Sequence, residues 1–272
     1  MTTGSDVGSY YRRIGGNRFE PTHHTQGAWR ENEQHMGPAA GLLAYAIETV
    51  FPRDDLQLCR VSYEILGVIN AEPLEVEVEV VRPGRTIELV EAWMIINGRA
   101  AIRAAGWRLA TADTSMVTGG VPDPMPGPDP WPAWDAENFW TGGYIDSLDI
   151  RVDPASVPGC SRAWLRTDLN LVDGEQASDL VAYTTLVDTA NGIAARRHPR
   201  EWAFPNIDLT IHYFRTPRFS EPDDRWVGLD TGSTWGPDGI GLTSTTLYDP
   251  CGAVGRAEQI LTLRPLGSTG PH

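Results

Sequence analysis

Three polar side chains in the second half of the chain are of types that can exchange protons or form hydrogen bonds with a bound molecule. Asp208 lies near the start of one stretch of alternating polar and apolar residues, Thr234 ends the next, and Gln259 lies in the last. A carboxylate can accept a proton, while threonine and glutamine can each donate and accept hydrogen bonds. The alternative is that Asp208 is a solvated charge on the edge of a sheet.

The stretch that carries Asp208 is expected to organise this half of the chain. Between Pro205 and Pro217, apolar residues alternate with polar ones, which is the period-two pattern of a half-buried strand. Pro217 ends the strand because proline cannot donate the next ladder hydrogen bond. Asp188 and Asn191 are polar residues in an apolar helix that precedes it, so they are candidates to face the site. That helix is predicted over 179–195, and further strands over 226–234, 240–248 and 253–264.

The first half has the same order of elements. An apolar helix rich in small residues is predicted over 35–51, and Pro38 suits its first turn because the missing N–H would have no intrahelical partner there. Such a helix is apolar nearly all round and should be buried, with its small residues admitting a close neighbour. Antiparallel strands are predicted over 57–69, 73–81, 86–96 and 99–110, with a strong hairpin signal at Asn97–Gly98.

The two halves align as an internal repeat. Residues 97–109 match residues 251–263 at a constant offset of 154. A repeat of this length indicates one fold unit that has been duplicated. At this offset Gln259 falls on Ala105, and the first-half segment that we compare with the Asp208 strand, around Arg60 and Val61, has no acid. The asymmetry predicts one site per chain, built on the second copy.

A proline-rich segment separates the two halves. Prolines recur at every second position over 122–132, which excludes a helix or a central strand, and four aromatic residues over 131–140 give the segment apolar anchors. We interpret it as an ordered linker on the surface, and the alternative is a docking motif for a partner domain. The predicted organisation is a first repeat over 19–110, a linker over 111–160 and a second repeat over 161–266.

The composition argues against several classes of function. The chain has 272 residues, a net charge of -14 and a pI near 4.8, which argue against nucleic-acid binding and against attraction to anionic membranes. No stretch approaches the roughly 18 apolar residues of a membrane span, and the N-terminus lacks a signal-peptide pattern, so a cytoplasmic protein is expected. The three cysteines and the His23–His24 pair lack metal-ligand spacing, so neither a metal nor a cofactor is expected.

On these residues the chain resembles the acyl-CoA thioesterase II branch of the double hotdog superfamily. The resemblance runs from about Phe19 to Pro265, with a gap over the linker. Its most specific parts are N-I-D-L-T-I-H-Y-F-R-T-P with Asp208, W-V-G-L-D-T-G-S-T with Thr234 and G-R-A-E-Q-I-L-T-L-R with Gln259. It implies an α+β double hotdog fold, in which two tandem helix-plus-antiparallel-sheet repeats form one continuous curved sheet around two buried helices.

The resemblance also implies a set of site residues. In the family an Asp, a Thr or Ser, and a Gln of the second hotdog hold the hydrolytic water, which corresponds here to Asp208, Thr234 and Gln259. Ser233 is the alternative to Thr234, and the choice stays open because the bulky Trp235 follows directly. The sequence contains no G-x-S-x-G nucleophile motif, so an oriented water is favoured over an acyl-enzyme.

The start of the first helix is the expected oxyanion site. Backbone N–H groups of Met36 and Gly37 are the expected donors, because the helix dipole favours negative charge at that end. His35 precedes them, and it either caps the helix or contacts the substrate. Coenzyme A phosphates would need a local arginine cluster in so acidic a chain, and Arg215 and Arg218 are the candidates.

The expected reaction is therefore hydrolysis of an acyl-CoA or acyl-carrier thioester. The alternative is a non-hydrolytic hotdog protein, either an enoyl-thioester hydratase or dehydratase or an acyl-binding module, because a fold does not determine a function. A dehydratase would need a histidine and an acid at the substrate, with His35 as the histidine. The sequence is also compatible with a homo-oligomer.

Overall fold

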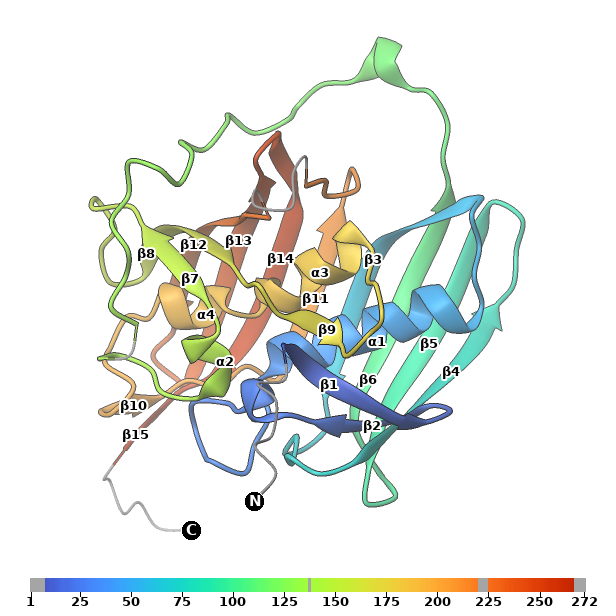
Figure 1. Cartoon of the computed structure of the whole chain (residues 1–272). Coiled ribbons are helices and arrows are strands. Elements are labelled where there is room, and N and C mark those ends of the chain that lie inside the picture. The colour runs from blue at the N-terminus through green and yellow to red at the C-terminus, as the bar shows by residue number, and fades with distance from the viewer. Residues whose placement is uncertain (1–7, 137, 220–224, 267–272) are drawn as a thin grey trace.

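One large mixed sheet dominates the structure, a computed structural model that describes residues 8–136, 138–219 and 225–266. Thirteen strands form this sheet in the order β7-β8-β12-β13-β14-β11-β3-β6-β5-β4-β2-β1-β9, and β10 and β15 form a separate pair. The strands β11 and β3 pair antiparallel, and this pairing joins the two halves of the chain. Figure 1 shows α1 and α3 against one face of the sheet, which we call the inner face.

The described strands have the following bounds: β1 Ser9–Gly15, β2 Arg18–Pro21, β3 Leu56–Ile65, β4 Leu74–Arg82, β5 Ile87–Ile96, β6 Arg99–Ala110, β7 Asp149–Val152, β8 Cys160–Arg166, β9 Asn170–Val172, β10 Trp202–Ala203, β11 Asp208–Tyr213, β12 Val227–Trp235, β13 Ile240–Asp249, β14 Gly252–Thr262 and β15 Arg264–Pro265. The predicted strand between Pro205 and Pro217 is shorter than expected, because only its six central residues pair as β11. The N-terminal strands β1 and β2 were not predicted.

The helices are α1 Met36–Val50, α2 Gly143–Asp146, α3 Asp179–Val187 and α4 Ala190–Ile193, with short 3-10 turns at His23–Thr25 and Ser115–Val117. The helix expected over 179–195 is thus divided, and Asp188 lies at the break as the C-cap of α3. Both long helices begin at a side-chain cap: His35 accepts from the N–H of Gly37, and Ser178 accepts from the N–H of Val181.

Glycines on α1 allow the two long helices to pack closely. A Cβ added at Gly37 would lie 2.6 Å from the carbonyl oxygen of Thr185 on α3, and one at Gly41 would overlap the Thr185 side chain. The inner faces of β4, β5 and β6 cover the other side of α1, whose residues are buried from Met36 to Ile47. The start of α1 therefore has a fixed position against the end of α3.

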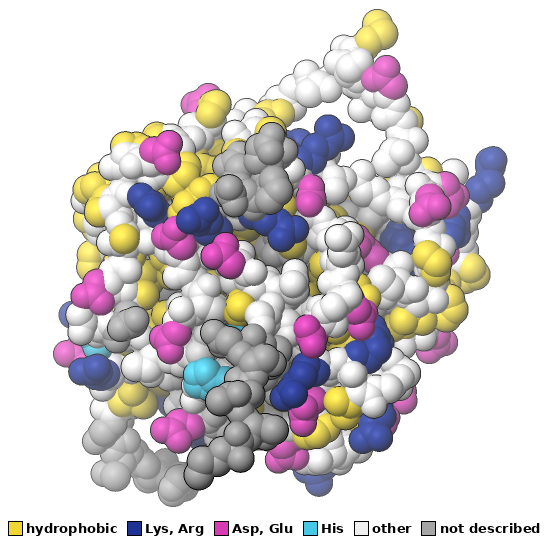
Figure 2. Space-filling model, in the orientation of Figure 1, with side chains coloured by type: hydrophobic (Ala, Val, Ile, Leu, Met, Phe, Trp, Pro, Cys, Tyr) yellow, Lys and Arg dark blue, Asp and Glu magenta, His cyan; other side chains and the backbone are white. Residues whose placement is uncertain are grey.

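The linker is held on the outer face of the second half by aromatic residues. Trp131 and the partly buried Met125 pack with Trp164 and Trp226 in a small second core, and the indole N–H of Trp164 donates to the carbonyl of Pro126 at 2.7 Å. Before these anchors the segment 111–124 stands off from the body as an arch (Figures 1 and 2). Among the described residues, no helix is long and apolar enough to cross a membrane.

Candidate active site

A cavity of about 420 Å³ opens where the start of α1 meets the end of α3. Its wall is mostly apolar and includes three tryptophans, and His35, Asp188 and Asn206 are among its polar residues. A concave apolar pocket with a few convergent polar groups is the usual form of a small-molecule site. The apolar side chains on its wall include Trp29, Met36, Ile65, Leu66, Val68, Ile69, Trp134, Trp140, Ile145, Ile193 and Ile207.

Asp188 is the buried carboxylate of this cavity. Its Oδ1 accepts two amide N–H groups, from Nε2 of Gln259 and from Nδ2 of Asn206, each at 2.8 Å. Its Oδ2 lies 3.5 Å from Nδ1 of His35. Burial raises the pKa of Asp188 to about 6, and the two amide donors partly offset that rise. One oxygen is thus held in place, and the other is left to exchange a proton near neutral pH.

His35 is neutral in this arrangement. Its Nδ1 accepts the backbone N–H of Gly37 at 3.0 Å, so the ring proton lies on Nε2. The ring stacks on Tyr144 with centroids 4.0 Å apart, and burial lowers the pKa of His35 to about 3. The hydroxyl of Tyr144 donates to the carbonyl of Thr185 at 3.0 Å, which fixes the stacking partner. His35 therefore caps α1, as one interpretation of the sequence expected, and it also lines the cavity.

The predicted group of Asp208, Thr234 and Gln259 is not assembled. Gln259 is buried on the inner face of β14, whereas Thr234 is exposed on β12 and Asp208 is half-exposed on β11. Side chains alternate between the two faces of a strand, so a change of one residue in register reverses the face. The carboxylate of Asp208 accepts the N–H of Ile260 at 2.6 Å, and Ile260 points outward next to the inward Gln259. Asp208 and Thr234 lie on the side of the sheet away from α3.

Ser233, the alternative to Thr234, does lie on the inner face. It pairs with Thr243, which pairs with Gln259, so the three residues form one row across β12, β13 and β14. Two strand spacings of about 4.8 Å separate Ser233 from Gln259, and the buried hydroxyl of Ser233 has no hydrogen-bond partner among the described residues. Trp235 lies on the same face as Ser233, two residues further along β12, and packs on Phe204 with ring centroids 5.4 Å apart.

The two expected oxyanion donors differ in whether their backbone N–H is free to bind a ligand. The N–H of Gly37 is already donated to His35, whereas Met36 is the first residue of α1 and its N–H has no intrahelical acceptor. Met36 lines the cavity. The helix start therefore offers the Met36 amide, supported by the helix dipole, as a donor to a developing negative charge.

Asn206 is the site residue that sequence reasoning missed. It precedes β11, and its Nδ2 donates both to Asp188 and to the carbonyl of Asp208, the latter at 3.0 Å. Asp188 and Asn191 were expected only as candidates to face the site, and both line the cavity. The useful signal was a carboxylate within an otherwise apolar helix, because such a charge needs partners when it is buried.

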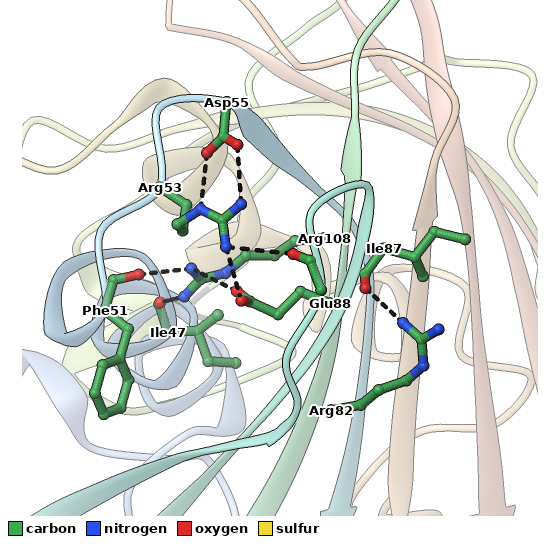
Figure 3. A network of polar contacts seen from close by, with 9 residues as sticks. Ile47, Phe51, Arg53, Asp55, Arg82, Ile87, Glu88 and Arg108 are labelled. Carbon is green, nitrogen blue, oxygen red and sulfur yellow. Dashed lines mark hydrogen bonds and ion pairs between the residues drawn. The ribbon is translucent and has the colours of Figure 1, made fainter.

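The corresponding place in the first half is filled by an ion network, shown in Figure 3. Arg108 on β6 donates to the carbonyls of Ile47 and Phe51 at the end of α1, much as Gln259 reaches the end of α3. Glu88 pairs with Arg108 at 3.3 Å and with Arg53 at 3.0 Å. Arg53 also donates to both carboxylate oxygens of Asp55, at 2.8 and 2.9 Å. Arg82 donates to the carbonyl of Ile87 nearby.

This network also corrects the alignment of the two halves. The offset of 154 places Gln259 on Ala105, but Ala105 pairs with Ser62 on the half-exposed face of β6. Arg108, not Ala105, is the residue of β6 that reaches the helix end. In the first half, Arg108, Glu88 and Arg53 thus form ion pairs at the place where the second half has the Asp188 carboxylate at a cavity.

Comparisons with known proteins agree with this architecture. A model of the acyl-CoA thioesterase N-terminal domain matches residues 25–109, and a model of the acyl-CoA thioesterase C-terminal domain matches residues 121–263. A search of curated proteins found no match.

Solved structures share the fold at low sequence identity. A hot dog fold protein of unknown function from Alicyclobacillus acidocaldarius is 14% identical, with a TM-score of 0.72 over 93% of this chain and 95% of that one. The acyl-CoA thioesterase II TesB2 of Mycobacterium marinum is 19% identical, with a TM-score of 0.66 over 96% and 97%. The tesB protein of Mycobacterium avium subs paratuberculosis is 17% identical, with a TM-score of 0.62 over 94% and 96%. With domain models that together match most of its length, the chain belongs to the acyl-CoA thioesterase family.

Proposed function

We propose that this protein hydrolyses acyl thioesters of the coenzyme A type in the cavity between α1 and α3. The observation that carries the proposal is the Asp188 carboxylate, whose Oδ1 is held by two amides while Oδ2 is free of such donors. Its pKa of about 6 suits a group that accepts a proton near neutral pH. The family match supports a thioester as the substrate class.

In this proposal a water molecule bound to Oδ2 of Asp188 is the nucleophile. Its oxygen attacks the thioester carbonyl carbon, and Asp188 takes the proton that the water loses. The N–H of Met36 at the start of α1 stabilises the negative charge on the carbonyl oxygen. The C–S bond then breaks, the thiolate takes up the proton that Asp188 holds, and the products are a carboxylic acid and a free thiol.

The proposed fold is two fused hot dog units that share one sheet. Each unit supplies one long helix, and the cavity lies at the contact between the start of α1 and the end of α3. The catalytic role first predicted for Asp208 and Thr234 passes to Asp188 and Asn206, because these two lie at the cavity with Gln259 behind them. The apolar wall suits an acyl chain, with the carrier group leaving toward the surface.

A matched pair of variants tests this assignment. D188N should lose thioester hydrolysis, whereas D208N should retain it, because Asp208 lies on the other face of the sheet. The measurement is thiol release from a panel of acyl-CoA thioesters of different chain lengths. Loss of activity in D208N with full activity in D188N would refute the proposed site, and no thiol release from any thioester by the unmodified protein would refute the function.

A second candidate is addition of water to an enoyl thioester, since a histidine and an acid do converge. Oδ2 of Asp188 lies 3.5 Å from Nδ1 of His35, which is the pair that such chemistry needs. The pKa of His35, near 3, makes the imidazole a weak base and favours hydrolysis. Loss of the enoyl absorbance without release of free thiol would favour this second function.

A further inference from the structure

Three basic side chains lie side by side on the outer face, away from the cavity. His212 on β11 pairs with Arg60 on β3 and with Arg256 on β14, so the three form one row across neighbouring strands. Directly paired residues lie about 5 Å apart, so the two arginines flank His212 on its neighbouring strands. Among the described residues, none of the salt bridges includes Arg60 or Arg256. The row therefore concentrates positive charge without an internal counterion.

The same row ends on an aromatic side chain. Trp107 on β6 pairs with Arg60, and Phe214 follows at the end of β11 with 55% of its surface exposed. A β-bulge in β3 between Leu58 and Arg60 shifts the register at this point, and such bulges often occur where a strand must re-aim a side chain. Two arginines, a histidine and two aromatic rings thus share one surface.

The arch turns this surface into a groove. A cavity of about 740 Å³ lies between the outer face and Gly120 and Pro122 of the arch, and its lining includes all three basic residues. Figure 2 shows the arch standing clear of the body with an opening beneath it. The floor continues onto Ile87 and Leu109, which pair across β5 and β6 and are both exposed.

One acid shares the groove with the row. Glu258 lines the groove, and its carboxylate accepts the hydroxyl of Ser244 at 2.6 Å on the neighbouring strand. Among the described residues it forms no salt bridge with Arg60 or Arg256, so two guanidinium groups share the groove with one carboxylate. Of the two arginines expected from the sequence to meet phosphates, Arg218 is exposed and lines a different cavity, and Arg215 is already engaged. Arg215 donates through both terminal nitrogens to Asp249 at 2.6 Å, so its guanidinium is already paired.

We propose that the groove under the arch binds a nucleotide. Arg60, His212 and Arg256 contact its phosphates, and Trp107 stacks on its base. Arginine suits this role because its planar guanidinium donates bidentate hydrogen bonds to phosphate and also packs on aromatic rings. The nucleotide is either free in solution or the nucleotide end of a coenzyme A thioester, and the second source alone rests on the proposed function.

Equilibrium binding of ADP and of inorganic pyrophosphate tests the site without any need for turnover. Calorimetry compares the unmodified protein with R60Q/R256Q, with W107L and with R99Q, in which an exposed arginine outside the groove is changed. We expect R60Q/R256Q to weaken both probes about tenfold or more, since charge-assisted hydrogen bonds are lost. W107L should weaken ADP alone, and R99Q should change neither. ADP binding that is absent, or equal in all four proteins, would overturn the proposal.

Kinetics then separate the two sources of nucleotide. KM is measured for one acyl group carried either by coenzyme A or by N-acetylcysteamine, which lacks a nucleotide. A rise in KM for the coenzyme A substrate only, in R60Q/R256Q, assigns the groove to the substrate's own nucleotide. Unchanged KM values together with weakened ADP binding assign it to a free nucleotide. Neither arginine takes part in a salt bridge among the described residues, so R60Q/R256Q should leave the thermal midpoint unchanged, which shows that the variant is folded.

Discussion

Replacing Asp188 by asparagine should inactivate the protein and at the same time stabilise it. The amide is isosteric, and its Oδ1 can still accept the N–H groups of Gln259 and Asn206. Its nitrogen cannot take a proton from water. Loss of a general base typically costs about 10² to 10⁴ in rate, so kcat should fall at least about 100-fold.

The stability gain follows from the raised pKa. Burial moves the pKa of Asp188 from 3.8 to about 6, so the folded protein holds a proton that the unfolded chain has released between these values. Relative to D188N, the unmodified protein is thus most stable below pH of about 4 and loses stability as the pH rises to about 6. At 1.36 kcal/mol per unit of pKa, the loss above pH 6 is about 3 kcal/mol.

Urea unfolding at pH 4 and at pH 8 measures this difference. We expect D188N to gain about 3 kcal/mol over the unmodified protein between pH 4 and pH 8. D208N is the matched control, because it removes a half-exposed carboxylate of the same type from the outer face. Stability differences that do not change with pH would refute the burial argument, and a folded D188N with normal turnover would refute the proposed base.

Three further predictions follow from the site and its supports. In the unmodified protein, kcat/KM should fall tenfold per pH unit below about 6, as Asp188 becomes protonated, and a profile that is flat from pH 5 to 8 would contradict this. G37A should lower the free energy of unfolding by about 1–3 kcal/mol, because its Cβ would meet the Thr185 carbonyl, and urea unfolding measures the loss. R108M should cost about 3–5 kcal/mol, because the buried Glu88 keeps only Arg53 as a partner and the carbonyls of Ile47 and Phe51 lose their donor. R108M/E88M should recover only the part of that loss that comes from Glu88, as urea titrations would show.

Local patterns were enough to predict most of the elements. Alternation predicted the long strands of both halves, and β6 has the bounds that the sequence indicated, Arg99–Ala110. The run of small apolar residues predicted α1, since these residues tolerate a close neighbour on every side. Such signals act between residues a few positions apart, so they can be read from one sequence. β1 and β2 were missed because their short, charged stretch lacks that alternation.

The site could not be predicted in the same way, because its make-up depends on which face of each strand packs against the helices. Asp208 and Gln259 both lie on strands with clear alternation, yet a period-two pattern has two equivalent faces, and register decides which one is buried. Only the packed sheet shows that Gln259 points toward α3 and that Asp208 points away. The sequence by itself determined the strands, the helices and the types of polar residue available. The tertiary structure decided that Asp188, from the break after α3, meets Asn206, Gln259 and His35, because these contacts join residues 18 to 153 positions apart.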